Sequence, residues 1–236
     1  MTSIKLDDRR PFRLVRDVNG RHRFGGQAEI AGAMPSGCDV PAQLVFDLDL
    51  TDPDVPFSSS AGLTRLPLIH PFKYGGGGGE LQYRVTGDYS VDILWVSDSE
   101  PDPPDEQYLQ IDYLPEVHFQ LSPLTYEQAR IVSFFATDRF FQPNEEDRAV
   151  LDDLYQDDLI LLGGPRQTLK NAGYFHCKNA QCSRHNLVSL PIYFLLVPAF
   201  EVGGTTEFWY EFDGDVTFYF ALCPHCQTIY TSNVCS

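Results

Sequence analysis

Four cysteines in the last third of the chain have the spacing of a metal site. Cys177 and Cys182 lie in FHCKNAQCSRH, and Cys223 and Cys226 lie in ALCPHCQTIY. Two short loops that each bring two thiolates together supply the tetrahedral sulfur set that suits Zn²⁺. A set of four protein ligands is closed, so it stabilises a fold and leaves no position for a substrate. The sequence therefore predicts one structural zinc ion.

Three histidines and a further cysteine are alternative ligands. His176 and His185 flank the first pair, His225 lies inside the CPHC turn, and Cys235 follows the second pair. Imidazole is an ordinary zinc ligand in mixed sites. Any of these residues could therefore replace one cysteine, although the spacing favours the four cysteines.

The tetrapeptide CPHC also occurs in thioredoxin-fold oxidoreductases. There the first cysteine is activated at the N-terminus of a helix within a βαβ unit. In this chain only ten residues follow Cys226, and the TIYT among them favours a strand. The context favours metal ligands over redox-active thiols.

Two other motifs do not match the ligand sites that they suggest. The run Gly75–Gly79 is followed by Glu80 and Leu81, where a phosphate-binding loop has a lysine and a hydroxyl residue. The acidic clusters in 98–106 and 152–158 lack the spacing of a calcium-binding EF-hand. We expect a hairpin tip and solvated surfaces at these places.

The net charge of −16 is concentrated in the middle third of the chain. Residues 85–160 contain eighteen Asp or Glu against three arginines, whereas 1–84 contain ten residues of each sign. A negative field repels DNA, RNA and anionic membranes, and it attracts cationic proteins within about a Debye length. We therefore expect a basic protein partner, no nucleic acid and no membrane.

The N-terminal sequence predicts a cytoplasmic location. No apolar stretch follows the charges of MTSIKLDDRRPFRLVRD, so we expect no secretory signal. The longest apolar run, 187–200, is interrupted by Pro191 and Pro198 and is too short to span a bilayer. In the cytoplasm the cysteines stay reduced, which favours metal binding over disulfides.

Alternating hydrophobic residues predict strands, among them 44–50, 80–87 and 91–98. In 44–50, the leucines and Phe46 alternate with smaller or acidic residues such as Asp47. This period of two is typical of a strand that is buried on one face only.

Two helices are expected in the acidic middle. The first covers 125–137 and begins with Thr125 and Gln128, which have the spacing of a capping box. The second covers 145–158, with Asn144 as its N-cap and acids in its first turn.

The segments on either side of these helices resemble each other. Gly25-Gly26 corresponds to Gly163-Gly164, LVFDLDL to PIYFLLV, and GGGGGELQYRV to DGDVTFYFAL. We therefore predict a β-rich α+β fold with two degenerate repeats in a single compact domain, 1–236. Its parts are a β-rich half (1–122), an acidic helical connector (123–160) and a second β-rich half (161–236) that a zinc site of the ribbon or knuckle type stabilises.

The order of motifs resembles the YwqG-like bacterial family, a domain of unknown function. The similar segments run from Phe24-Gly25-Gly26 to Asp47, over Gly79-Glu80-Leu81-Gln82-Tyr83, and from Asp153 to Pro165. The chain departs from the family in having Asp47 where Gln is common, and in its four-cysteine insert. The resemblance implies a duplicated α+β fold and transfers no catalytic residue. Similar proteins are often encoded beside bacterial toxins, which implies a possible immunity role.

The function expected from these features is non-enzymatic. A zinc-stabilised, acidic protein would bind a basic protein, such as a bacterial toxin, through its acidic surface. The alternative is an enzyme or small-ligand binder that uses a cleft between the two repeats. A third possibility is an assembly factor that docks through the zinc module.

Overall fold

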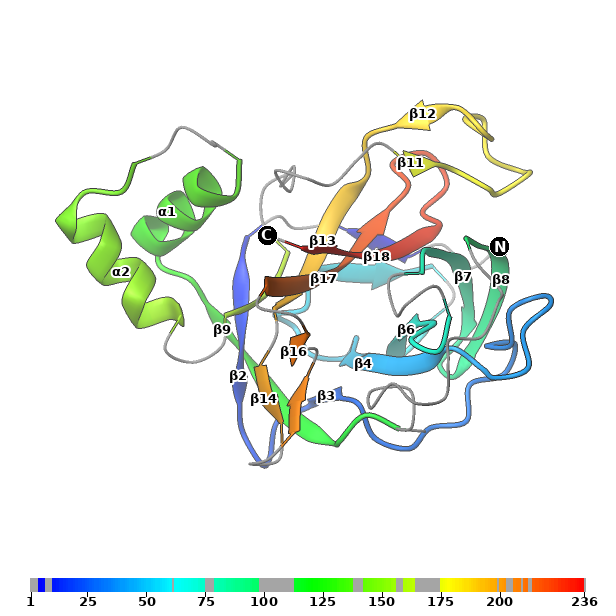
Figure 1. Ribbon diagram of the computed structural model, residues 1–236, viewed down its shortest axis with the longest axis horizontal. Coiled ribbons are helices and arrows are strands. Elements are labelled where there is room, and N and C mark those ends of the chain that lie inside the picture. Colours follow the sequence, from blue (N-terminus) through cyan, green and yellow to red (C-terminus); the bar gives the residue numbers. More distant parts are fainter. Residues whose placement is uncertain are drawn as a thin grey trace.

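The fold is dominated by one twelve-stranded sheet, accompanied by two helices (Figure 1). This architecture confirms the predicted β-rich α+β class. The computed structural model describes residues 4–6, 10–60, 62–74, 79–97, 113–137, 142–155, 159–163, 175–198, 200–202, 206–208, 210–211 and 214–235.

Every strand pair of the large sheet is antiparallel. Its strands, in spatial order, are β6 (Arg65–His70), β4 (Gln43–Asp49), β3 (His22–Phe24), β9 (Val117–Pro123), β2 (Phe12–Arg16), β10 (Ile160–Leu162), β13 (Ile192–Pro198), β17 (Gly214–Leu222), β18 (Ile229–Cys235), β7 (Leu81–Gly87) and β8 (Ser90–Val96), with β16 (Tyr210–Glu211) beside β17.

Three small sheets and the helices complete the described structure. The small sheets pair β1 (Ile4–Leu6) with β5 (Phe57–Ser59), β11 (Phe175–His176) with β12 (Val188–Ser189), and β14 (Phe200–Val202) with β15 (Thr206–Phe208). The helices are α1 (Tyr126–Thr137) and α2 (Glu145–Tyr155). The last three residues of the second predicted helix, 156–158, lie outside the described residues. Neither described helix is long and apolar enough to cross a membrane.

The large sheet curls until its β6 edge reaches β7. The hydroxyl of Tyr83 in β7 accepts the N–H of Ile69 at 3.1 Å and donates to the carbonyl of Pro67 at 3.4 Å, both in β6. His70 Nδ1 lies 3.1 Å from Thr231 Oγ1 in β18. The curled sheet encloses the main hydrophobic core, in which Phe24, Phe46, Phe218 and Phe220 are among the fully buried side chains.

The strand order is the same on both sides of the β2–β9 pair. From that pair outward it runs β9-β3-β4-β6 on one side and β2-β10-β13-β17 on the other. Along the chain, β2, β3, β4 and β6 follow one another, and so do β9, β10, β13 and β17. The sheet therefore contains two repeats that have exchanged their first strands.

Irregularities of the backbone recur at equivalent places in the two repeats. The register shifts at Val45 in β4, against β6, and at Phe194 in β13, against β17. The N–H of Gly25 donates to the carbonyl of Val45 at 2.9 Å, and that of Gly163 to the carbonyl of Phe194 at 2.7 Å. Both glycines have a positive φ, 59° and 75°, which favours glycine. The repeats thus share local geometry and not only strand order.

The position of β17 in the sheet corrects one of the correspondences predicted between the two halves of the chain. The segment DGDVTFYFAL forms most of β17, which pairs with β13 as β6 pairs with β4. Its counterpart is therefore β6 and not the GGGGGELQYRV segment, which contains β7. The sheet order also places β9 (Val117–Pro123) at the start of the second repeat, ahead of the boundary predicted at residue 123. One continuous sheet joins strands from both predicted halves.

The expectation that β4 is buried on one face is wrong. Its residues from Gln43 to Leu48 are all buried, and Asp47 is only 1% exposed. Arg65 Nε donates to Asp47 Oδ1 at 2.8 Å, and the Tyr89 hydroxyl donates to Oδ2 at 3.1 Å. These partners cover the polar face and stabilise a carboxylate that would be costly to bury alone.

Both helices begin as their sequences predict. The Gln128 N–H donates to Thr125 Oγ1 at 3.2 Å, and the Thr125 N–H donates to Gln128 Oε1 at 2.9 Å, which completes the capping box of α1. At α2 the Asp147 N–H donates to Asn144 Oδ1 at 2.8 Å. These bonds satisfy amides that the helices themselves leave without a partner.

The helices pack against the outer face of the second repeat. Val132 of α1 and Leu154 of α2 form a small core with Leu161 of β10, and Leu196 of β13 packs against it. Leu196 corresponds to Asp47 of β4, because both follow the bulged residue of their strand by two positions. The same face of the sheet is thus apolar under the helices and polar in the first repeat.

In the first repeat, Tyr74 joins the β6–β7 turn to the β3–β4 connection. Its buried hydroxyl accepts the N–H of Val40 at 2.6 Å and donates to the Val40 carbonyl at 2.8 Å. The Tyr74→Phe substitution would leave both backbone groups without this partner, and we expect it to lower the free energy of unfolding by about 2 kcal/mol. Urea denaturation measures the change. Tyr126→Phe, at a residue 85% exposed, is the control and should have no effect. Equal stability of the two variants would contradict this role.

Candidate metal centre

The four predicted cysteines meet at one place. The Sγ atoms of Cys177, Cys182, Cys223 and Cys226 all lie within 4.8 Å of one another. Cys177 Sγ is 3.5 Å from Cys226 Sγ, and Cys182 Sγ is 3.9 Å from Cys223 Sγ. Four sulfurs in a regular tetrahedron, each about 2.3 Å from a zinc ion, would be about 3.8 Å apart. The sulfur positions therefore fit one tetrahedral metal ion.

The β11–β12 hairpin supplies the first pair of cysteines. Cys177 directly follows β11, and its carbonyl accepts the Asn186 N–H at 2.8 Å. The Cys182 N–H donates to the carbonyl of Asn179 at 2.9 Å, which turns the chain back toward the cluster. Asn179 Oδ1 also accepts the N–H of Gln181 at 3.0 Å. Side-chain and backbone bonds together shape this loop.

The turn between β17 and β18 supplies the second pair. The Cys223 N–H donates to the Thr228 carbonyl, and the Gln227 N–H donates to the Cys223 carbonyl, both at 2.9 Å. Gln227 has a φ of 59°, which closes this tight turn. Both strands are buried up to the turn, so the sheet fixes the place of Cys223 and Cys226.

Backbone amides face all four sulfurs. The Arg184 N–H donates to Cys182 Sγ at 3.4 Å. The other three sulfurs accept N–H groups as well: Cys177 from Asn179, Cys223 from His225 and Cys226, and Cys226 from Thr228. Such donors stabilise negative charge on sulfur. They favour the thiolate form that binds a metal.

The thiols influence one another strongly. Hydrogen bonds from Cys177 and Cys223 lower the pKa of Cys226, which favours the thiolate form of this residue. Hydrogen bonding to Cys223 and Cys226 raises the pKa of Cys177. Four thiolates in one cluster repel one another, so full deprotonation requires a cation among them. The donor set is thus suited to a divalent metal ion.

Gln82 of β7 attaches the first cysteine loop to the sheet, which the sequence did not reveal. Its Nε2 donates to the carbonyl of His176 at 3.0 Å, and its Oε1 accepts the N–H of Lys178 at 2.8 Å. These two groups flank Cys177, and Gln82 is only 1% exposed. The residue lies in the GELQY segment, whose alternation predicted a strand but no contact with the cysteines.

Thr228 links the two cysteine loops. Its Oγ1 lies 3.2 Å from Cys226 Sγ and accepts from Asn179 Nδ2 at 3.4 Å. Both polar residues are buried. Phe175 stacks on Tyr230 nearby, with ring centroids 5.5 Å apart. The loops are thus held together by polar and aromatic contacts as well as by their sulfurs.

The alternative ligands lie outside the sulfur cluster. His176, His185 and His225 are exposed, and His176 Nδ1 is directed at the Asn186 carbonyl, 3.2 Å away. Cys235 ends β18, six residues beyond Ile229 at the metal end of that strand. An antiparallel strand of this length spans about 20 Å. The described geometry thus brings together the four cysteines and leaves these four residues apart.

Positive charge lies close to the cluster. Residues 175–198 contain Lys178 and Arg184 and no Asp or Glu. Lys178 Nζ lies 5.3 Å from the centre of the Trp95 ring, a cation–π contact. A divalent ion with four thiolates carries two negative charges, and these two cations offset them.

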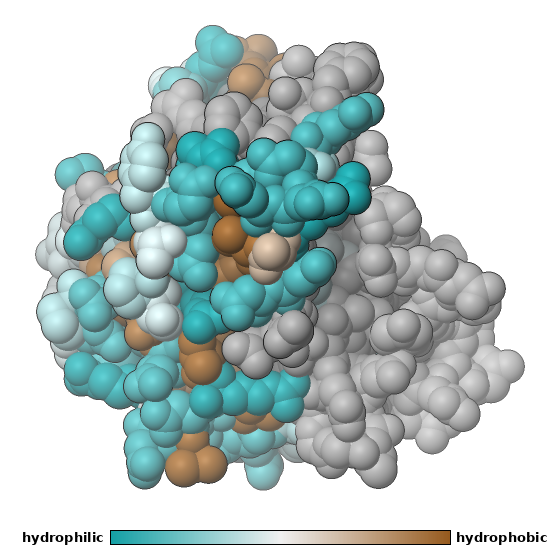
Figure 2. Space-filling view, turned by 90° about the vertical axis from the view of Figure 1, so that its left-hand side faces the viewer, coloured by the Kyte–Doolittle hydropathy of each residue, from teal (hydrophilic) through white to brown (hydrophobic). Residues whose placement is uncertain are grey.

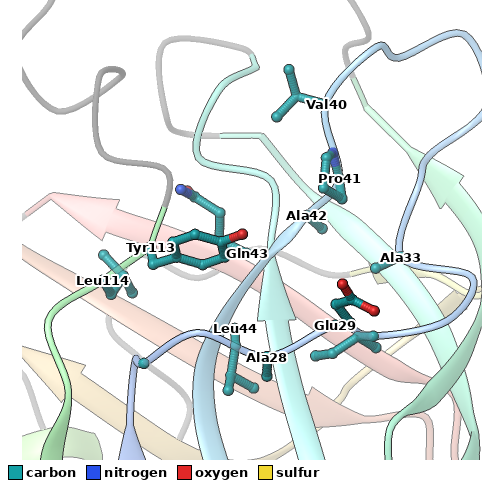
Figure 3. A pocket seen from close by; sticks show the side chains of 12 residues that line it. Ala28, Glu29, Ala33, Val40, Pro41, Ala42, Gln43, Leu44, Tyr113 and Leu114 are labelled. Atoms are coloured by element: carbon teal, nitrogen blue, oxygen red, sulfur yellow. The ribbon is translucent and has the colours of Figure 1, made fainter.

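A cavity of about 330 Å³ has none of the four cysteines in its described lining (Figure 3). Its described walls come from the β3–β4 connection, from the first two residues of β4, and from Tyr113 and Leu114. It therefore lies within the first repeat. The alternative prediction of a ligand cleft between the repeats remains a prediction.

Comparison with known proteins adds no relative. No protein-family model, curated protein or solved structure matches this chain. The fold and the site define it as a β-rich α+β protein with a cluster of four cysteines that can hold one metal ion.

Proposed function

We propose that the metal is one zinc ion and that it stabilises the fold. A tetrahedral set of four sulfurs accepts zinc or iron, and a closed set with no substrate position is typical of structural zinc. The geometry of Cys177, Cys182, Cys223 and Cys226 supports this assignment. Elemental analysis distinguishes the two metals. Visible absorption is a second criterion, because an iron tetrathiolate is coloured and a zinc tetrathiolate is not.

The proposed function is that of a non-enzymatic cytoplasmic binding protein whose acidic surface receives a basic protein. The observation that carries this proposal is the acidic helical pair at one side of the sheet (Figure 1). Exposed acids there are Glu127, Glu145, Glu146, Asp152 and Asp153. Arg130 pairs with Glu127 and Asp147, and Arg148 is exposed on α2, so the two described helices carry six acids against two arginines.

The helical side also has the character of a recognition surface. Its described residues are mostly hydrophilic, with small hydrophobic areas between them (Figure 2). Tyr126 of α1 is 85% exposed beside these acids. Tyrosine is enriched at protein interfaces, and acidic charge accelerates encounter with a basic partner. A bacterial toxin is one such partner, and the protein would then act as its immunity protein.

The binding proposal predicts a strong dependence on salt. The immobilised protein should retain a basic protein from a lysate of its source cell below about 0.1 M salt and release it by about 0.5 M. A variant in which Glu145, Glu146, Asp152 and Asp153 are changed to their amides should lose this binding. The matched control changes Glu201, Glu207, Glu211 and Asp215, which removes the same charge outside the acidic middle.

The outcomes separate specific binding through the helices from non-specific attraction and from binding through another surface. Loss of binding in the helical variant alone supports the proposal, and rescue of cells that express the retained protein would show immunity. Equal loss in both variants would indicate non-specific attraction to net charge. Binding that salt does not weaken, or that both variants keep, would contradict the proposal and point to another surface.

A further inference from the structure

The cavity in the first repeat owes its volume to small side chains. Gly26, Ala28, Ala33 and Ala42 form part of its wall, and Ala33 and Ala42 also belong to the main hydrophobic core. At about 330 Å³ it is within the range of small-molecule sites. Cavities with apolar walls take up apolar groups readily because water gains few hydrogen bonds there.

The chain around the cavity is fixed by backbone bonds, so it cannot simply collapse. The Ala42 N–H donates to the Ala33 carbonyl at 2.8 Å. Ala31 forms a bridge with β8, in which its N–H donates to the Tyr89 carbonyl and its carbonyl accepts the Val91 N–H, both at 2.9 Å. Tyr74 holds the far side through Val40. The cavity is therefore preformed.

The polar groups of the cavity select the charge of a ligand. Its described lining contains Glu29 as the one charged residue, together with the amide of Gln43 and the hydroxyl of Tyr113 (Figure 3). Glu29 is exposed, as expected of a carboxylate at the rim. The net charge of −16 also raises the local concentration of cations. A cationic head with an apolar body fits both features.

We propose that this cavity binds a small organic amine. The apolar body would lie against the alanines, and the ammonium group would pair with the Glu29 carboxylate. Neither the metal centre nor the acidic helices take part, so this site is independent of the proposed protein binding.

Three probes of similar shape test the proposal: benzylamine, benzyl alcohol and benzoate. Isothermal titration and ligand-observed NMR of the metal-loaded protein measure their binding. We expect benzylamine to bind about tenfold more tightly than benzoate, with benzyl alcohol between them. Glu29→Gln should weaken benzylamine binding about threefold and leave benzyl alcohol unchanged. Ala28→Leu, which occupies part of the cavity, should weaken binding of all three.

Controls make the result decisive. Glu145→Gln on α2 removes the same charge far from the cavity and should leave benzylamine binding unchanged. The proposal is overturned if no probe binds, if Glu145→Gln has the effect of Glu29→Gln, or if benzoate binds as tightly as benzylamine. Should Ala28→Leu fail to fold, Ala42→Leu narrows the cavity from the residue that precedes β4, and unchanged binding in the folded variant also overturns the proposal.

Discussion

Removal of the metal is expected to unfold the β11–β12 hairpin and the β17–β18 turn. These two loops would lose the ion that is proposed to join the four sulfurs and would gain mutual repulsion among thiolates. We expect chelation to lower the free energy of unfolding by about 5 kcal/mol or more. For a chain of this length the midpoint of thermal unfolding would fall by roughly 10–20 °C. Thermal denaturation with and without a chelator, followed by addition of zinc, measures the loss and its recovery.

Single substitutions locate the effect. Cys223→Ser should match the chelated protein, because serine does not replace a buried thiolate ligand. Cys38→Ser is the control, since Cys38 lies outside the cluster. This variant should unfold at the wild-type temperature, and a chelator should lower that temperature as it does for the wild type. Hydrogen exchange should rise first in the cysteine loops. If neither the chelator nor Cys223→Ser changes the unfolding temperature, the protein has no structural metal.

Gln82→Leu is expected to have the second largest effect. Leucine is similar in size to glutamine, but it cannot form hydrogen bonds. The substitution therefore leaves the carbonyl of His176 and the N–H of Lys178 without their buried partner. Each unsatisfied group costs about 1–3 kcal/mol, so we expect a loss of about 2–4 kcal/mol in stability. The first cysteine loop would also be less ordered, and zinc affinity should fall about 10–100-fold. Competition with a zinc-binding dye measures the affinity.

The control for this substitution is Gln120→Leu in β9. Gln120 is an exposed glutamine in the same sheet, so its substitution should change neither stability nor zinc affinity. Equal zinc affinity in Gln82→Leu and the wild type would contradict the role of Gln82 in positioning Cys177. A loss of stability without a loss of affinity would show that Gln82 only supports the sheet.

The fold was predictable where the signal is local. Both helix N-termini follow from caps within three residues of sequence, and the glycine turns at Gly25 and Gly163 follow from a backbone that needs a positive φ. The exchange of β2 and β9 between the repeats was not predictable, because it depends on pairing across more than ninety residues. The burial of Asp47 was not predictable either, because the partners that cover it, Arg65 of β6 and Tyr89 of the β7–β8 turn, lie 18 and 42 positions further along the chain.

In the candidate metal centre, too, the features set by local sequence were predictable and those that depend on distant residues were not. Cys177, Cys182, Cys223 and Cys226 were recognisable because short loops bring each pair together, whatever the rest of the fold. Gln82 could not be recognised, since its two bonds to the first cysteine loop cross more than ninety positions. A glutamine in a strand has no signal that separates a buried partner of backbone groups from a solvated side chain.

Native mass spectrometry of the purified protein, with elemental analysis, tests the central claim most directly. We predict one zinc ion per chain, retained in the folded protein and lost in Cys223→Ser. The same spectrum should show all cysteines reduced in the metal-loaded form. A metal-free wild-type chain with a Cys223–Cys226 disulfide would contradict the structural zinc site and would make redox chemistry the better explanation of the CPHC turn.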